Sequence, residues 1–153
     1  MGDLQDELRK KILKEEEKHD QPKEERKMIQ FYKDGALDPD LVQDQALKWA
    51  RSFLKDKKPL TMSQLRKFYG EVLDIEAKKK AGADFKHLLP LIKMMKSKAA
   101  YAYSNGGSNQ KIPRSFKEFI DIMIDSVNEP KDFDAFKLVF EAVVGYSVGE
   151  GVR

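Results

Sequence analysis

Apolar residues recur every three or four positions along most of this chain, and that spacing is the feature that most restricts its fold. It matches the α-helix, whose buried stripe repeats about every 3.6 residues, whereas a half-buried strand alternates from one residue to the next. No stretch alternates convincingly in that way. The sequence therefore predicts an all-α protein, a compact bundle of about five helices over residues 38–147, preceded by an additional charged helical arm.

Proline, glycine and capping residues set the expected helix boundaries. Pro22 and Pro59 interrupt periodic segments because proline has no amide hydrogen to give a helix. Asp38 before Pro39 has the order of an N-cap and a first-turn proline. The predicted helices are an arm at 3–19, a short helix at 23–34 ending at Asp34-Gly35, and helices at 38–57, 61–80, 84 or 90 to 103, 115–128 and from about 132, with residues 145–153 as a loose end.

Two helices lead to further expectations. Ser115 and Glu118 have the spacing of a capping box, which predicts that they begin the helix at 115–128. The helix that ends at 103 is apolar on most of its sides, so we expect it to be the central, buried one. The predicted buried faces of the bundle helices carry aromatic residues, with Trp49 at the border: Phe53, Phe68, Tyr69, Phe116, Phe119, Phe133, Phe136 and Phe140.

The length of the chain fits one independently folding domain. It has 153 residues, of which 41% are hydrophobic. A chain of this size buries about 68–70% of its unfolded surface, so it needs no disulfide or metal to fold. We therefore expect two regions, a charged helical arm at 1–34 and a helical bundle domain at 35–153.

The sequence also limits the chemistry and the location of the protein. It contains no cysteine, which excludes disulfides, thiolate nucleophiles and cysteine-ligated metal sites. The N-terminus has no apolar core of a signal peptide, and no window approaches the roughly 18 uninterrupted apolar residues of a membrane span. We expect a soluble, cytoplasmic protein.

The formal net charge of +3 conceals an uneven distribution along the chain. From Lys48 to Lys111 there are 15 basic and 5 acidic residues, whereas the segments on either side are net acidic. Such a basic block suits a polyanionic partner, because Lys and Arg release counterions from phosphates when they bind. Ordinary solvated helix faces would give the same count.

No constellation of residues predicts catalysis. His19 and His87 are far apart, and neither has a carboxylate at a ligand-like spacing. The nucleophile elbow, the Walker loop and the dinucleotide-binding glycine motif are all missing from the sequence. Asp121 and Asp125 lie one helical turn apart, and without a histidine or third acid nearby they predict a solvated face. We expect a protein that is not an enzyme and has no metal or cofactor.

The candidate binding residues are cationic. Arg66 is the sharpest candidate, because a rigid guanidinium beside the small Ser63 and Gly70 can bind a phosphate through two hydrogen bonds. Its alternative role is a salt bridge with a helix carboxylate. Tyr101 either stacks on a base or fills the core. The other candidates form basic rows on the predicted helices: Lys48, Arg51, Lys55, Lys67, Lys96 and Lys98.

Three segments resemble the small subunit of the type III-A CRISPR–Cas Csm effector complex. Residues 59–74, PLTMSQLRKFYGEVLD, resemble the family's L-T-x-S-Q-[IL]-R run at the start of a helix. Residues 91–104, LIKMMKSKAAYAYS, resemble its helix with a basic residue five positions before a tyrosine, here Lys96 and Tyr101. Residues 140–146, FEAVVGY, resemble its closing helix. The resemblance covers about 30–150 and leaves the arm outside.

The resemblance implies an all-helical, non-catalytic subunit that binds RNA. Several copies would line the backbone subunits of the complex and hold the guide RNA with its target RNA, while other subunits cleave nucleic acid. The family's basic contacts would fall on Arg66, Lys67 and Lys96. The start of their helix would be placed by Thr61, Ser63 and Gln64. The family often has an arginine where this chain has Asn105, and Lys111 is the candidate to replace it.

Two hypotheses of different classes follow. The first is a non-catalytic structural subunit of a type III-A interference complex that contacts guide and target RNA through phosphates and helps antiviral defence. Its partners would be the backbone and large subunits, neighbouring copies of itself and, in isolation, a second copy in a homodimer. The second is a helical protein-interaction module without direct nucleic-acid binding, whose arm pairs with another helix through Leu4, Leu8 and Ile12. Retention of RNA at moderate salt would separate them.

Overall fold

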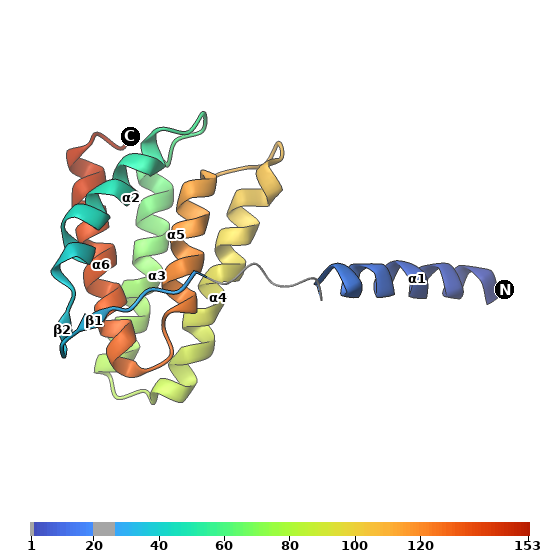
Figure 1. Cartoon of the computed structure of the whole chain (residues 1–153), viewed down its shortest axis with the longest axis horizontal. Helices are drawn as coiled ribbons and strands as arrows, with labels where there is room; N and C mark the ends of the chain where they lie inside the picture. Colours follow the sequence, from blue (N-terminus) through green and yellow to red (C-terminus); the bar gives the residue numbers. More distant parts are fainter. Residues whose placement is uncertain (1, 20–26) are drawn as a thin grey trace.

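The computed structural model describes the backbone at residues 2–19 and 27–153. The α-helices are α1 (Gly2–His19), α2 (Asp44–Leu54), α3 (Met62–Lys80), α4 (Phe85–Tyr103), α5 (Arg114–Asp125) and α6 (Pro130–Gly149) (Figure 1). Between them lie two short strands, β1 (Tyr32–Lys33) and β2 (Ala36–Leu37), and two 3₁₀ helices, η1 (Pro39–Val42) and η2 (Ser104–Gly106). The prediction of an all-α bundle of about five helices is confirmed by α2 to α6.

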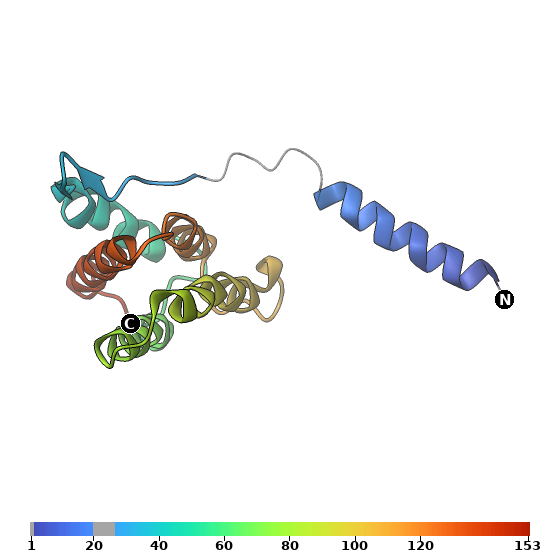
Figure 2. The ribbon, with the colours of Figure 1, turned by 90° about the horizontal axis from the view of Figure 1, so that it is seen from below.

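The bundle has three layers, with α5 and α6 in the middle. α2 packs on both of them from one side, while α4 packs on α5 and α3 packs on α6 from the other side. Figure 2, which looks along the helices, shows this order. The expectation that α4 is the central helix is wrong. Its buried residues form one stripe, Leu88, Ile92, Met95, Ala99 and Ala102, while Met94 is 51% exposed and Tyr101 is 79% exposed on the outer side.

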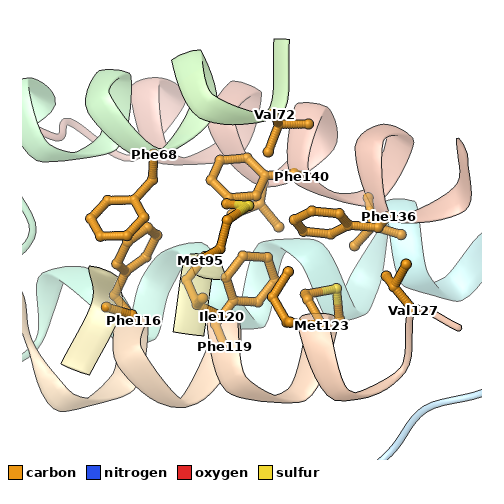
Figure 3. Close-up of a cluster of buried hydrophobic side chains, with 14 of the residues drawn as sticks. Phe68, Val72, Met95, Phe116, Phe119, Ile120, Met123, Val127, Phe136 and Phe140 are labelled. Atoms are coloured by element: carbon orange, nitrogen blue, oxygen red, sulfur yellow. The ribbon is translucent and has the colours of Figure 1, made fainter. Parts of the chain in front are cut away.

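Aromatic rings of the middle layer join the two outer layers. Phe116 of α5 lies 5.1 Å from the ring of Phe53 on α2 and 5.2 Å from that of Phe68 on α3, both edge to face. Phe119 and Phe140 continue the cluster, and Figure 3 shows the rings converging between the helices. Edge-to-face pairs stabilise the core beyond the burial of their area. The predicted aromatic core is confirmed, and Trp49 is half-buried against Phe119 at its border.

The short helix predicted at 23–34 is wrong over its described part, where residues 32–37 form a β-hairpin. β1 and β2 pair antiparallel through Tyr32 with Leu37. The turn between them has positive φ at both central residues, 53° at Asp34 and 80° at Gly35, which is the conformation that Asp-Gly favours in two-residue hairpins. The pair is a hairpin turn and not a helix exit. Residues 23–26 lie outside the described part of the chain.

Several other predicted boundaries differ from the structure. Asp38 does cap a helix, accepting from the Asp40 amide at 3.1 Å, but that helix is η1, which ends at Val42, and the separate helix α2 runs from Asp44 to Leu54. The capping box at Ser115 is wrong, because α5 begins at Arg114 with Pro113 as its N-cap and no side chain caps it. The Ser115 hydroxyl instead donates to the Ser52 carbonyl at 3.1 Å. The capping box in the structure joins Glu129 and Asp132 at the start of α6.

The predicted loose end at 145–153 is also wrong. α6 continues to Gly149, and Val152 is buried. The Met62 amide donates to the Arg153 carbonyl at 2.8 Å, so the end of the chain is bound to the first turn of α3. By contrast, Thr61 caps α3 as predicted, accepting from the Gln64 amide at 3.2 Å.

The arm helix is confirmed as α1, whose described side chains at 3–11 are all exposed, including Leu4 and Leu8. The side chain of Ile12 lies outside the described residues. The proposed division between an arm at 1–34 and a bundle at 35–153 stays a prediction. Across the described residues, no helix has the length and apolar character needed to cross a membrane.

Candidate nucleic-acid interface

The predicted binding residues lie on two opposite layers of the bundle. Lys48, Arg51 and Lys55 belong to α2 or its C-cap, on one side of α5 and α6. The remaining candidates belong to α3 and α4, on the other side. The structure therefore divides the predicted site into two surfaces.

The α2 surface is exposed and partly neutralised. Lys48, Arg51 and Lys55 are all exposed. The Arg51 Nε lies 3.4 Å from Glu150 Oε1 at the end of α6, whereas Lys48 and Lys55 have no acidic partner among the described side chains. Two of the three cations are therefore open to an anionic ligand.

Arg66 and Lys67 project from the N-terminal half of α3, after the turn that Thr61 caps. Both side chains are exposed. The salt bridge considered for Arg66 does not form within the described part of the chain, and Lys67 has no acidic partner there either. Gly70 lies one turn beyond Arg66, and a Cβ added there would meet no atom within 4 Å.

Lys96 and Lys98 are only two residues apart, yet they lie on opposite flanks of α4. The Lys96 Nζ lies 2.7 Å from Asp125 Oδ1 on α5, and the Lys98 Nζ lies 2.7 Å from Glu71 Oε2 on α3. The Asp125 side chain is only 11% exposed. Lys96 therefore forms an ion pair that holds α4 on α5.

The carboxylates expected on a solvated face of α5 are both occupied. Asp125 accepts from Lys96, and Asp121 Oδ2 accepts from the Lys117 Nζ at 2.7 Å. Both side chains are partly buried. The expectation of a solvated face is therefore wrong, since Asp125 joins α5 to α4 and Asp121 forms an ion pair within α5.

A groove of about 320 Å³ separates α3 from α4 and brings several candidates together. Its lining residues are Lys67, Phe68, Glu71, Ser97, Lys98, Tyr101, Ala102 and Lys111. The ring of Tyr101 projects outward, so the alternative of a core role is wrong. The Lys111 Nζ lies 5.9 Å from the centre of that ring, within the range of a cation–π contact.

Lys111 reaches this groove from the α4–α5 connection, where the sequence made it the candidate to replace the family's arginine. Asn105, which holds that arginine's place, lines a different cavity together with Tyr103 and Arg114. The two positions therefore serve different surfaces. Whether Lys111 takes over the arginine's contact stays a prediction.

Basic residues gather at one end of the bundle, the upper end in Figure 1, where α2 and α4 end and α3 and α5 begin. Residues 48–71 carry seven basic and two acidic side chains. At the opposite end, residues 121–141 carry two basic and six acidic side chains. The end of α3 and the start of α4 also lie there, and residues 74–87 add four basic and three acidic side chains. The basic block of the sequence is therefore divided between the two ends.

Two basic residues of this end were missed in the sequence. Lys57 and Lys58 lie in the exposed turn between α2 and α3, directly before the L-T-M-S-Q-L-R run. Their position close to that run was the available signal, whereas the predicted rows of cations lie on helices. Neither has an acidic partner among the described side chains.

The described residues contain no group of three or more histidine, aspartate or glutamate side chains placed to hold a metal ion. Burial raises the pKa of the Tyr69 hydroxyl, and the nearby Glu141 raises it further, while Lys137 acts in the opposite direction. The ring of Tyr69 stacks on Phe140 with centres 5.6 Å apart. This tyrosine packs α3 on α6 and forms no part of the groove.

Comparison with known proteins yields one family. The model of the family described as Csm2, type III-A, matches residues 36–148. The match begins at β2 and ends within the last turn of α6, so it spans the hairpin's second strand and the whole bundle, and it leaves out α1. No curated protein and no solved structure matches the chain.

Proposed function

Because the chain belongs to the type III-A Csm2 family, whose members are structural subunits of a CRISPR effector complex, we propose that it holds guide RNA and target RNA through their backbone phosphates. It acts without catalysis and contributes to antiviral defence. The observation that carries the proposal is the pair Arg66 and Lys67, which is exposed at the basic end of the bundle without an acidic partner in the described chain.

Phosphate contacts suit the chemistry of this surface. Contacts to phosphates fix the register of a protein on a nucleic acid without reading its sequence, as a subunit that serves many guides requires. Arg66 offers a planar fork that matches two phosphate oxygens, while Lys67 supplies a mobile point charge. Lys96 is left out of the proposed contacts, because Asp125 already binds its ammonium group at 2.7 Å.

Lys48 and Lys55 on the α2 side are proposed as additional phosphate contacts, since both are exposed and have no acidic partner among the described residues. The proposed protein partners are the backbone and large subunits and neighbouring copies of this chain. Residues 74–87 and 121–141 at the opposite end carry six basic and nine acidic side chains in all, and this acidic excess supports such end-to-end neighbours. A homodimer of the isolated chain stays a prediction.

The test is a double charge reversal, Arg66→Glu with Lys67→Glu, in the full chain. Binding of a fluorescein-labelled single-stranded RNA of guide length is measured by anisotropy across a salt series. Each lost phosphate contact lowers the log–log salt slope by roughly 0.7 for single strands, so the double variant should lose about 1.4. A slope equal to that of the wild type would overturn the proposal.

The matched control is Lys78→Glu with Lys86→Glu. These lysines are exposed on α3 and α4 at the opposite end of the bundle, so the control has the same change in net charge. It should keep the wild-type slope within about 0.3, because its lysines contact no phosphate. An equal loss in both variants would mean that net charge, and not this surface, governs binding.

The second candidate function is a protein-interaction module without nucleic-acid binding. It is favoured by exposed apolar side chains on the outer faces of three helices, Leu73 on α3, Met94 on α4, and Leu138 and Val148 on α6. The same titration separates the two functions. If the wild-type chain shows no salt-dependent RNA binding even at low salt, the interaction module is the better description.

A further inference from the structure

The groove between α3 and α4 contains features that phosphate contacts alone do not use, namely an outward-facing aromatic ring and an apolar floor. We propose that this groove binds one unpaired nucleotide of RNA, with its base stacked on Tyr101. The inference rests on the proposed RNA-binding function and deepens it. It assigns the chain a preference for single-stranded over fully paired RNA.

Tyr101 presents its ring to solvent instead of packing it. It is 79% exposed, although the neighbouring Ala99 and Ala102 are buried. The Lys111 ammonium group lies 5.9 Å from the ring centre, which orients the ring from one side. A stacked base and a nearby cation are the two contacts with which proteins hold single strands, since every base has a π-face.

The groove has the size and lining for a nucleotide. Its volume of about 320 Å³ lies at the lower end of small-ligand sites, which span about 300–1,000 Å³. Phe68 and Ala102 are buried and form an apolar floor. A base covers such a floor with its own flat apolar face, whereas a whole duplex is too large to enter.

The charges around the groove favour an anion. Glu71 is the acidic residue of the lining, and its Oε2 lies 2.7 Å from the Lys98 Nζ, so that pair is internally neutralised. Lys67 and Lys111 have no acidic partner among the described residues. The groove therefore keeps a net positive charge beside its stacking ring, which matches the phosphate of a nucleotide whose base lies on Tyr101.

This arrangement distinguishes paired from unpaired RNA. In a duplex both faces of each base are already stacked and the deep groove hides the base edges, so a protein ring can reach a base only where it is unpaired or splayed out. Lys67 and Arg66 contact phosphates in either form. Stacking on Tyr101 adds affinity only for the single-stranded form.

The test compares Tyr101→Ala and Tyr101→Phe in the full chain. Anisotropy is measured with a labelled oligoadenylate RNA, alone and paired with oligouridylate, at one low salt concentration and across a salt series. Tyr101→Ala should weaken single-strand binding by about fivefold or more, since it removes one stacked base. Tyr101→Phe keeps the ring and should stay within about twofold of the wild type.

The control variant is Met94→Ala, which removes another exposed apolar side chain from the outer side of α4. It should bind both RNA forms as the wild type does. Duplex binding should be unchanged by Tyr101→Ala, and the salt slope for the single strand should also stay the same, because no phosphate contact is lost. Circular dichroism confirms that each variant keeps its helices.

The outcomes distinguish this inference from the proposed function. Unchanged single-strand affinity in Tyr101→Ala, together with a reduced slope in the Arg66 and Lys67 double variant, overturns base stacking and leaves phosphate binding in place. The groove would then be assigned to a peptide of a partner subunit. Equal weakening for single strand and duplex also overturns stacking. Absence of RNA binding by the wild type overturns both proposals.

Discussion

The two flanks of α4 have similar residues and different tasks. On the flank that faces α5, the Lys96 Nζ binds Asp125, and the Lys93 Nζ donates to the Ile124 carbonyl at 2.8 Å. On the flank that faces α3, Lys98 binds Glu71, but Lys67 and Lys111 have no acidic partner among the described residues. Both flanks therefore join α4 to a neighbouring helix, but only the second keeps unpaired cations beside it and is left positive and open.

This difference depends on helix packing and not on residue type. α4 and α5 pack closely enough for both lysines of one flank to find acceptors, whereas α3 and α4 enclose a groove. A cation contributes to a ligand surface only when packing leaves it without an acceptor. The comparison therefore predicts which lysines can be changed without loss of stability, and which without loss of RNA binding.

The largest effect is expected at the core that supports both flanks. Phe116→Ala removes a ring that contacts Phe53 on α2 and Phe68 on α3. Removal of a buried phenylalanine typically costs about 3–5 kcal/mol, through lost burial and the cavity that remains. Urea unfolding followed by circular dichroism should show this loss, with Leu138→Ala, an exposed site on α6, within about 0.5 kcal/mol of wild type. A loss below about 1 kcal/mol would mean that the two outer layers are not joined through this ring.

The helical core was predictable because its signal is local. The spacing of apolar residues predicted most boundaries of the bundle helices to within a few residues. Thr61 was predicted as the N-cap of α3 from its residue type and position. The hairpin was missed because Asp34-Gly35 suits both a helix exit and a two-residue turn. What decides between them is tertiary: Phe31 is buried, and the Ile29 amide donates to Ser126 Oγ at 2.9 Å, 97 residues away.

The sequence predicted which cationic residues belong to the candidate site, but it could not predict which of them form ion pairs with acidic residues. Lys67 and Lys98 were named from the sequence, but the acid that binds Lys96 lies on another helix, 29 residues further on. Tyr101 was left open between stacking and the core, although its outward position follows from its angular position around the helix. The buried stripe of α4 steps from Met95 to Ala99 and Ala102, and Tyr101 lies nearly opposite this stripe.

A smaller effect on stability is expected from two substitutions that test the flanks directly, one at Lys96 on α4 and one at Lys67, which faces the other flank from α3. Lys96→Met leaves the mostly buried Asp125 carboxylate without its partner, which should cost about 1–3 kcal/mol in unfolding free energy. Lys67→Met should change stability by less than about 0.5 kcal/mol, because its ammonium group has no described partner. Urea unfolding of both variants measures the difference.

In RNA titrations the larger effect should come from Lys67→Met and the smaller from Lys96→Met, the reverse of their effects on stability. Lys67→Met should lower the salt slope for single-stranded RNA by roughly 0.7, one phosphate contact, whereas Lys96→Met should leave it unchanged. If Lys96→Met lowers the slope and keeps the stability of the wild type, the division of α4 into a packing flank and a binding flank is wrong.

The smallest change in stability and RNA binding is expected when Lys98, which Glu71 neutralises in the groove, loses its ion pair. Glu71→Gln removes the carboxylate that binds Lys98, while both side chains are partly exposed, so the change in stability should stay within about 1 kcal/mol. The freed ammonium group should raise single-strand affinity and increase the salt slope by up to roughly 0.7. Glu118→Gln is the matched control, since it frees Arg114 on the far side of α4. An equal gain in both variants would mean that general charge, and not the position of Lys98 in the groove, sets the affinity.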